Sequence, residues 1–336
     1  MSKFIVITSI NYPTQAVKEF SMMEDWKVIV VADLKTPQDW QLEDVTLLTV
    51  EEQEKLPFET AKRLPWNHYA RKNLGYLYAI SQGAELIYET DDDNLPYETW
   101  QQSFPLNRTV EASTHTDAGK YINAYCHFTD KQVWPRGFPL AAVTSPEVNV
   151  QATQSFQVSR SHAPVLQGLA DLEPDVDAIY RLTVGQQIKF DEKLPLFLKP
   201  GTYCPFNSQN TLWYSEAFPY LYLPGFVPSR VTDIWRGYIT QRFLHLQEKG
   251  MLFCSAGVYQ ERNFHNLMQD FEEEISLYTK TEDLVKDLDI YQEDYNGIIE
   301  YLSARGFFKL EEIALFQAWL QDLDSLGLSF PQAGFP

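Results

Sequence analysis

The stretch AELIYETDDDNLPYETW, residues 84–100, joins an apolar run to three consecutive carboxylates. Leu86–Tyr88 is typical of the end of a buried strand, and Asp91–Asp93 follow almost at once. Carboxylates this close together repel one another, so a fold tolerates them only where water or a cation offsets the repulsion. The place of this acidic triplet in the fold therefore decides whether it is an ordinary turn or a cation site.

The sequence before the triplet alternates between apolar runs and helical patterns. Residues 4–10 and 26–33 are rich in apolar and β-branched residues, which predicts strands buried on both faces. Helical patterns occupy 15–23 and 69–83, and Gly83 is a suitable C-terminal stop for the second. Strands separated by helices predict an α/β fold with a mostly parallel central sheet.

All three predicted strands lead into polar or acidic residues. Asn11 follows the first, Asp33 ends the second and the acidic triplet follows the third. Open α/β sheets bind their ligands outside the carboxyl ends of the strands. We therefore expect these side chains to meet at one rim of the sheet and to outline a pocket.

The composition is that of an acidic globular protein. Of 336 residues, 44% are hydrophobic, which is enough for the core of one large domain or two ordinary ones. The formal charge of −19 repels nucleic acid and anionic membranes, and no run of Lys and Arg is longer than two residues. Nucleic acid is therefore not expected as a partner, whereas an oligomer is compatible with the composition.

The sequence also bears on the cellular compartment. No segment approaches the roughly 20 apolar residues that a membrane-spanning helix needs. The opening MSKFIVITSI is followed by no small-residue cleavage site, so it predicts a first strand and not a signal peptide. Cys126, Cys204 and Cys254 are odd in number and form no CxxC pair, which favours a reducing compartment. We expect a cytoplasmic protein without a transmembrane segment.

The second half of the chain is less periodic. Residues 100–225 are rich in Pro and aromatic side chains, which predicts short strands and loops that belong to the same domain. A helix is expected at 231–249 and a strand at 251–255.

Residues 265–325 combine helical periodicity with heavy acidic charge. The predicted helices lie at 265–278, 281–304 and 309–324. We accordingly divide the chain into a main domain (1–278), which would contain the pocket at the strand ends, and an acidic helical C-terminal subdomain (279–336).

The acidic triplet has two interpretations. In an extended loop, Asp91 and Asp93 project to one side, where they can share a divalent cation with water and phosphate oxygens, while Asp92 braces the loop. An EF-hand is excluded because Leu95 and Pro96 occupy the places of a ligand and of the turn glycine. The alternative is an acidic turn that caps the next helix. The position after a buried strand favours the cation.

Arg71, Lys72 and Asn73 form one of the few positive spots in this acidic chain, and they open the helix predicted at 69–83. Two cationic side chains beside a helix N-terminus suit a phosphate or pyrophosphate. The alternative is that they are simply solvated, or that Arg71 pairs with an acid and holds the loop.

Two later residues are candidates for chemistry. Asp233, in SRVTDIWRGY, is either a helix cap, the commonest use of such a residue, or a general base for an acceptor hydroxyl. His265, in RNFHN, is a lone histidine of the kind that is usually structural. At a loop-to-helix junction it could instead add a nitrogen ligand to a metal.

Together these stretches resemble the STELLO-type family of glycosyltransferases. The matching segments span residues 4–278 and include NYPT, KTPQDW, RKNLGYLYAISQGAELIYETDDDN, GLADLEPDVDAIYRL, TDIWRGYITQR and RNFHNLMQDFEEE. A weaker likeness, carried by the triplet, PRGFP, GLADLEPDVDA and TDIWRGY, reaches the reversibly glycosylated plant proteins that act as nucleotide-sugar mutases. No membrane anchor like that of the plant STELLO proteins is recognised, so their Golgi role and cellulose-linked acceptor are not carried over.

The resemblance implies a GT-A type fold in which a D-x-D motif holds Mn²⁺ or Mg²⁺ on the donor pyrophosphate. Asp91 would lie near the ribose or the metal, Asp93 would ligate the metal, and His265 would be a further ligand. Arg71 would neutralise the pyrophosphate, and Asp233 would lie on the acceptor side. The residues expected to bind the donor are Asn11, Asp33, Arg71, Lys72, Asn73, Asp91, Asp92, Arg136 and Arg236.

The expected function is a divalent-metal-dependent glycosyltransferase that uses a nucleotide sugar, with a UDP-sugar favoured, and an unknown glycan, lipid or protein acceptor. A metal and Arg71 would stabilise the departing diphosphate, and carboxylates would stabilise an oxocarbenium-like transition state. One alternative is a nucleotide-sugar mutase or self-glycosylating protein, with Arg136 in PRGFP as the modified residue. Another is a non-catalytic interaction protein, which the acidic tail after residue 279 suggests.

Overall fold

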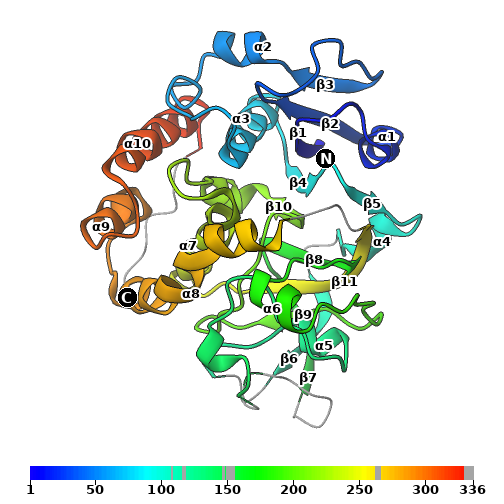
Figure 1. The fold of residues 1–336 in the computed structure, drawn as a ribbon, viewed down its shortest axis with the longest axis vertical. Helices are drawn as coiled ribbons and strands as arrows, with labels where there is room; N and C mark the ends of the chain where they lie inside the picture. The colour runs from blue at the N-terminus through cyan, green and yellow to red at the C-terminus, as the bar shows by residue number, and fades with distance from the viewer. Residues whose placement is uncertain (107–108, 116–118, 146–147, 149–155, 262–265, 329–336) are drawn as a thin grey trace.

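The computed structural model describes residues 1–106, 109–115, 119–145, 148, 156–261 and 266–328. Its strands form one mixed sheet in the order β3-β2-β1-β4-β10-β8-β11-β9-β6-β7, and β5 pairs with β11 (Figure 1). The strands are β1 (Lys3–Ser9), β2 (Trp26–Ala32), β3 (Val45–Leu48), β4 (Leu86–Asp91), β5 (Asn94–Pro96), β6 (Val110–His115), β7 (Phe156–Ser161), β8 (Val165–Leu172), β9 (Leu196–Leu198), β10 (Asn210–Tyr214) and β11 (Met251–Gln260).

Helices lie between several of the first strands, and further helices follow the last strand. The α-helices are α1 (Gln15–Ser21), α2 (Val50–Lys55), α3 (Lys72–Ser81), α4 (Trp100–Ser103), α5 (Tyr125–Phe128), α6 (Ala178–Thr183), α7 (Ser229–Leu246), α8 (Leu267–Ile290), α9 (Ile298–Ala304) and α10 (Leu310–Ser325). Short 3-10 turns are η1 (Tyr69–Arg71), η2 (Leu140–Ala142), η3 (Ser215–Leu221) and η4 (Tyr295–Gly297).

The N-terminal part of the sheet is parallel, as the sequence predicts. β2 lies between β1 and β3, β1 lies between β2 and β4, and all three pairs run parallel. The strands are nearly continuous runs of buried apolar residues, because helices such as α3 cover the sheet. Gly75 lets α3 lie close: a Cβ there would stand 2.5 Å from Val6 and 2.8 Å from Val31. The predicted α/β class is confirmed, and it is consistent with a GT-A type fold.

Beyond β4 the sheet becomes mixed. β10 pairs antiparallel with both β4 and β8, whereas β8 and β11 run parallel. The strand predicted at 251–255 is longer than expected, since β11 continues past an irregularity between Cys254 and Val258 and pairs with β5. β5 follows the acidic triplet directly, so this pairing connects the triplet to β11, in the other half of the sheet.

The C-terminal helical extension is confirmed, but its boundaries differ from those expected. α8 runs unbroken through residue 278, so the proposed domain boundary lies inside a helix. The single helix predicted at 281–304 is wrong: the chain turns after Ile290, and Asp294 caps the short η4 turn before α9. Tyr291 and Tyr295 are buried at this break, so packing of their rings offsets the lost helical hydrogen bonds.

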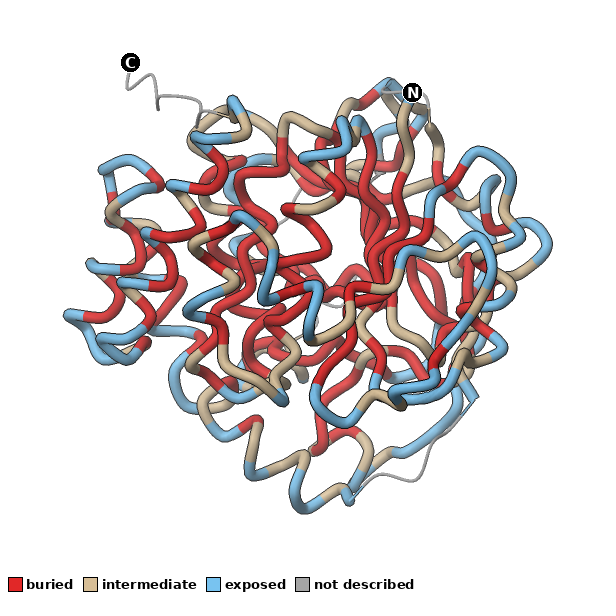
Figure 2. Tube along the Cα trace, turned by 90° about the horizontal axis from the view of Figure 1, so that it is seen from above, coloured by how far each residue is buried: buried red, intermediate tan, exposed pale blue. Residues whose placement is uncertain are grey.

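Two buried acids of α10 accept hydrogen bonds from distant loops, and α10 lies beside the loop that follows α2 (Figure 1). Asp322 accepts the backbone N–H groups of Glu59 and Thr60, each at 2.8 Å. Glu312 accepts those of Gly225 at 3.0 Å and Phe226 at 2.8 Å. Apolar residues of α8, α9 and α10 belong to the same hydrophobic cluster as residues of β1 and α3, and buried segments run through the centre of the molecule (Figure 2). The division at residue 278 remains a prediction.

His245 in α7 makes stability depend on pH. Burial, reinforced by Arg242, lowers its pKa from 6.5 to about 4. The folded state therefore disfavours the protonated ring, so the contribution of His245 is complete above pH 6.5 and is lost as the pH falls from 6.5 towards about 4. At pH 4.5 we expect a loss of about 2 kcal/mol from this residue. Phe in its place keeps the ring contact with Tyr203, whose centroid lies 4.7 Å away, but cannot titrate.

The measurement is urea unfolding of the wild type and His245→Phe at pH 7.5 and pH 4.5. Other acids titrate equally in both proteins, so only the difference between the two pH-dependent losses is informative. We expect the variant to lose about 2 kcal/mol less than the wild type. Equal losses would contradict the assignment.

Candidate active site

A cavity of about 550 Å³ opens at the carboxyl ends of β1, β2 and β4. Asn11, Asp33 and the whole acidic triplet line it, so the three strand ends meet at one rim as expected. Among the described residues that line it, seven are acidic and five are Lys or Arg. The acidic residues are Asp33, Asp91, Asp92, Asp93, Glu173, Asp175 and Asp233, and the basic ones are Lys35, Arg71, Arg136, Arg181 and Arg230.

Asp33 holds the wall of the cavity at the end of β2. Its Oδ1 accepts the N–H groups of Leu34 at 2.7 Å and Asn67 at 2.8 Å, and its Oδ2 accepts that of His68 at 3.1 Å. Both carboxylate oxygens of Asp33 therefore accept hydrogen bonds from backbone N–H groups. Asp33 lines the predicted donor pocket, and its hydrogen bonds fix the 67–68 loop against the strand end.

Asp92 braces the turn between β4 and β5. Its carboxylate accepts hydrogen bonds from the Ser9 hydroxyl and, at 3.0 Å, from Asn11 Nδ2, while its backbone carbonyl accepts from Thr14. Burial raises its pKa even though Ser9 and Asn11 lower it. Asp92 thus joins the triplet to the end of β1, which is the bracing role that the sequence assigns to it.

Asp91 and Asp93 present carboxylates to the cavity. Asp93 accepts a hydrogen bond from Gln260 Nε2 at 2.6 Å, from the end of β11. Asp91, the last residue of β4, has a side chain that is 33% exposed, and its Oδ1 accepts from the Tyr69 hydroxyl at 2.6 Å and from Lys72 Nζ at 3.1 Å. The hydrogen bonds from Tyr69 and Lys72 therefore both reach Oδ1, and part of the Asp91 side chain remains exposed.

Three residues predicted to contact the donor do not line the cavity. Lys72 Nζ is fully buried and donates to Tyr69, Asp91 and the Thr90 carbonyl. Asn73 Nδ2 donates to the Leu223 carbonyl at 2.8 Å, and its Oδ1 accepts the Leu223 N–H at 2.8 Å.

Arg236 is the third of these residues, and it forms a bidentate pair with Glu89 at 2.8 and 2.9 Å. All three are buried, and the Lys72 ammonium, the Asn73 amide and the two terminal guanidinium nitrogens of Arg236 have partners within the fold. None of the three lines the cavity, so the structure gives no support to their predicted contact with the donor.

Arg71 lies at the cavity wall but is deeply packed. Its guanidinium donates to the Gln53 side-chain oxygen and the Leu64 carbonyl. The centroid of the Trp66 ring lies 3.6 Å from the guanidinium carbon. Burial lowers its pKa to about 10 although the negative charge of Asp33 opposes this. Arg71 thus carries a positive charge whose hydrogen-bond acceptors are neutral, which makes it suited to an anion in the cavity.

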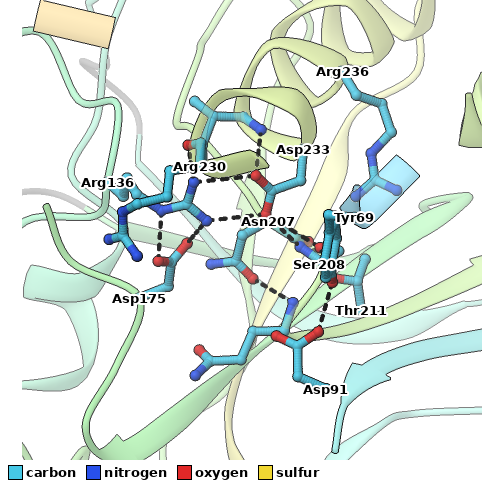
Figure 3. A network of polar contacts seen from close by, with 12 residues as sticks. Tyr69, Asp91, Arg136, Asp175, Asn207, Ser208, Thr211, Arg230, Asp233 and Arg236 are labelled. Atoms are coloured by element: carbon cyan, nitrogen blue, oxygen red, sulfur yellow. Dashed lines mark hydrogen bonds and ion pairs between the residues drawn. The ribbon is translucent and has the colours of Figure 1, made fainter. Parts of the chain in front are cut away.

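Arg136 is the centre of a buried charge cluster on the other side of the cavity (Figure 3). Its Nε and one terminal nitrogen donate to Asp175 at 2.7 and 2.9 Å. Its terminal nitrogens donate to Asp233 at 3.2 and 3.0 Å and to the Arg230 carbonyl. All five guanidinium N–H donors therefore have acceptors, and the cluster joins α7 to the loops before η2 and α6.

The two carboxylates of this cluster differ in basicity. Burial would raise the pKa of Asp233, but Arg136 outweighs it and holds this pKa below its ordinary value. Burial raises the pKa of Asp175 in spite of the same guanidinium. The predicted base Asp233 is therefore the weaker base of the two, and its Oδ2 already accepts from Ser208 as well as from Arg136.

Sequence reasoning missed several residues of this wall. They are Lys35, Tyr69, Glu173, Asp175, Arg181, Ser208, Gln209, Arg230 and Gln260. Asp175 lies in GLADLEPDVDA, where three acids within five residues were a usable signal. Ser208 and Gln209 lie in an ordinary polar stretch, and their position depends on the pairing of β10 with β4 and β8.

Among the residues that the structure describes, no metal site is preassembled from side chains. Within the described ranges, no three His, Cys, Asp or Glu side chains are grouped so that they could hold a metal ion. His265, the predicted third ligand, lies outside the described residues. A metal held by Asp91 and Asp93 would therefore need further oxygens from water and from a bound ligand.

Comparison with known proteins gives consistent matches. The family model "STELLO glycosyltransferases" matches residues 230–333. Two Arabidopsis thaliana proteins, "Probable glycosyltransferase STELLO1" and "Probable glycosyltransferase STELLO2", are each 30% identical over 353 residues and cover 98% of this chain. The aligned region is 45% and 46% of those proteins, so the chain spans about half the length of the relatives it matches.

A structural match and a membrane search complete the comparison. The solved structure "Crystal Structure of a Mycobacterial Protein" covers 87% of this chain and 76% of its own, with a TM-score of 0.43 and 8% identity, a similarity too low to bear on fold or function. In the part of the chain that the structure describes, no helix is both long and apolar enough to cross a membrane. The cytoplasmic location remains a prediction.

The alignment to the two plant proteins runs through the strand ends, the acidic triplet and the Arg136 cluster, and the family model covers α7 to α10. The chain is therefore similar over nearly its whole length to the STELLO glycosyltransferases.

Proposed function

We propose that this protein is a divalent-metal-dependent glycosyltransferase that takes its sugar from a nucleotide-sugar donor, a UDP-sugar in the first instance. The observation that carries the proposal is the acidic triplet at the carboxyl end of β4, inside a cavity with more carboxylates than basic side chains. A nucleoside diphosphate is an anion, and it enters such a cavity only together with a cation that reverses the local sign. The similarity to the STELLO glycosyltransferases supports the same reaction class.

The residues present fit Mn²⁺ or Mg²⁺ in the presence of the donor. Asp91 and Asp93 supply hard oxygen ligands, which both ions prefer, and phosphate oxygens and water would fill the other positions. Such an ion, when bound, supplies charge stabilisation for the departing diphosphate. Arg71 at the wall and the exposed Lys35 at the edge would bind the phosphates, while Asn11 and the fixed 67–68 loop would contact the nucleoside.

The Arg136 cluster is the proposed acceptor side. Asp233 is held in its ionised form by Arg136, so it would orient the acceptor and stabilise developing positive charge on the sugar. Asp175 is the better candidate to take a proton from an acceptor hydroxyl, because its pKa is raised. The acceptor would be a glycan, lipid or protein.

The structure gives less support to the other two candidate functions. Self-glycosylation at Arg136 would require its guanidinium to leave two buried ion pairs, and only 7% of this residue is exposed. The interaction-protein reading relies on a separate acidic tail, but α8, α9 and α10 are packed into the main hydrophobic cluster. Neither has an observation in its favour that matches the acidic cavity.

Calorimetry with UDP and a panel of nucleotide sugars, with and without Mn²⁺, tests the proposal. We expect binding in the micromolar range with Mn²⁺ and at least tenfold weaker binding after EDTA treatment, since the cation offsets the carboxylates. Asp93→Asn should abolish the Mn²⁺ dependence, whereas Asp44→Asn, at an exposed position outside the cavity, should keep it. Failure of every donor to bind the wild type in Mn²⁺ would refute the proposal.

A further inference from the structure

The Tyr69 hydroxyl lies between the two ends of the cavity. It donates to Asp91 Oδ1 at 2.6 Å and lies 2.6 Å from Ser208 Oγ (Figure 3). It also accepts a hydrogen bond from Lys72 Nζ. Tyr69, Asp91 and Ser208 all line the cavity. One phenol group therefore contacts both a residue of the acidic triplet and the loop before β10.

Ser208 continues this chain of hydrogen bonds to the acceptor side. Its backbone N–H and its hydroxyl both lie 3.2 Å from Asp233 Oδ2. The same oxygen accepts from Arg136 at 3.0 Å. An unbroken path of Asp91, Tyr69, Ser208, Asp233 and Arg136 thus runs along the cavity wall (Figure 3).

The heavy atoms of this path are fixed by their surroundings. Asn207 N–H donates to the Gln167 side chain at 2.9 Å, and the Asn207 carbonyl accepts from Thr211 at 2.6 Å, which holds the loop that carries Ser208. On the other side, the His68 ring accepts the Ala70 N–H at 3.1 Å and fixes the η1 turn that carries Tyr69. The hydroxyl protons are therefore the parts of the path that can rearrange without backbone movement.

Counting protons gives two arrangements. Tyr69 and Ser208 each have one hydroxyl proton, and their contact needs one of the two. In the first arrangement Tyr69 donates to Asp91 and Ser208 donates to Tyr69. In the second, Tyr69 donates to Ser208 and Ser208 donates to Asp233. Asp91 gains a hydrogen bond in the first and Asp233 gains one in the second, so the two carboxylates compete for the same pair of protons.

We propose that Tyr69 is a positioning residue that couples occupancy of the donor end of the cavity to the state of Asp233, through Ser208. The inference rests on the proposed function. A cation against Asp91 makes that carboxylate a poorer acceptor, so the Tyr69 proton turns to Ser208 and the Ser208 proton turns to Asp233. Asp233 is then oriented by an additional donor when the donor substrate is in place, which links the two halves of the site in the order that transfer requires.

A double-mutant cycle tests the coupling. We expect Tyr69→Phe and Ser208→Ala each to weaken Mn²⁺-dependent UDP binding by less than about threefold but to lower kcat by about tenfold. The double variant should lose no more than the stronger single variant, because both act through one path. Tyr88→Phe is the matched control: it removes a buried phenol hydroxyl that donates to Asn210 at 2.8 Å and lies outside the cavity lining. It should leave kcat within twofold of the wild type.

Losses in kcat that multiply in the double variant, or a Tyr88→Phe loss as large as that of Tyr69→Phe, would overturn the coupling. Retention of the phenyl ring, which packs against the main core, keeps Tyr69→Phe folded, and thermal unfolding checks this. Ser208→Thr keeps a hydroxyl at this position, so a kcat of Ser208→Thr above that of Ser208→Ala supports the coupling.

A second readout does not use activity. Tyrosine labelled with ¹³C at Cζ reports the hydrogen bonding of each phenol, and Tyr69→Phe identifies the Tyr69 resonance. Adding Mg²⁺ with UDP should move this resonance in the wild type and move it at most half as far in Ser208→Ala, where the proton has no second acceptor. Equal movement in both proteins, or none in the wild type, overturns the inference.

The two readouts separate this inference from the proposed function. If the donor binds but the Tyr69 resonance does not move, the coupling is refuted and the proposed function is not. Movement of the resonance without sugar transfer to any acceptor refutes the transferase and supports the coupling. Absence of both binding and movement refutes both.

Discussion

Asp91→Asn is expected to lower kcat/KM for sugar transfer by about 100-fold or more, with Asp93→Asn close behind. The reason is electrostatic: each change removes a negative charge that would hold the cation against the departing diphosphate, and such interactions at a reacting centre contribute about 10²–10³-fold. Asn is nearly isosteric with Asp, so Asp91→Asn still accepts from Tyr69 and Lys72. Transfer from a radiolabelled UDP-sugar, measured over a range of Mn²⁺ concentrations, gives the change in rate and in apparent metal affinity.

The control for charge alone is Asp44→Asn, which is exposed and lies outside the cavity lining. It should stay within twofold of the wild type. Asp91→Asn leaves the buried Lys72 without its carboxylate partner, so thermal unfolding must show that the variant is folded at the assay temperature. A folded Asp91→Asn enzyme with more than a third of wild-type turnover would exclude Asp91 from the reaction.

The sequence was informative about where polar groups gather. Strand ends can be placed from apolar runs because a buried parallel strand needs apolar residues on both faces. Asn11, Asp33 and Asp91 therefore came to one rim as expected. The bracing role of Asp92 also follows from local geometry, since alternate residues of an extended segment point to opposite sides.

The sequence was less informative about which polar residues face the cavity. Asn73 and Arg236 have the chemistry of ligand-binding residues, and nothing nearby in the chain marks them as buried. Their partners are distant: Leu223 lies 150 residues from Asn73, and Glu89 lies 147 residues from Arg236. A buried polar residue and a functional one are distinguished by whether the fold supplies a partner, and that depends on tertiary pairing.

Arg236→Met is expected to reduce the free energy of unfolding by about 3–5 kcal/mol, because it leaves the Glu89 carboxylate buried without its counter-charge. Both side chains are at most 1% exposed. Glu89 keeps its hydrogen bond from Trp213 Nε1 at 2.8 Å and one from the Tyr76 hydroxyl, but these donors are neutral. Urea unfolding at pH 7.5 measures the loss.

The double variant Glu89→Gln/Arg236→Met should recover more than half of the loss. The amide still accepts from Trp213, and Met can fill the space beside the Trp213 ring, whose centroid lies 5.0 Å from the guanidinium carbon. Arg305→Met is the control for loss of a surface ion pair: Arg305 is 39% exposed beside Asp287, and we expect a change of about 1 kcal/mol or less. An Arg236→Met loss no larger than that of Arg305→Met would contradict the prediction.

The same pair connects the stability of the fold to the geometry of the site. Glu89 lies two residues before Asp91 on β4, and Arg236 lies three residues after Asp233 on α7. Their buried bidentate contact therefore joins the strand that carries Asp91 to the helix that carries Asp233. At temperatures where Arg236→Met is still folded, we expect it to lower kcat more than it weakens UDP binding. The double variant, which restores packing between β4 and α7 without the charges, should regain kcat in parallel with stability, because distance and not charge is what this pair contributes to the reaction.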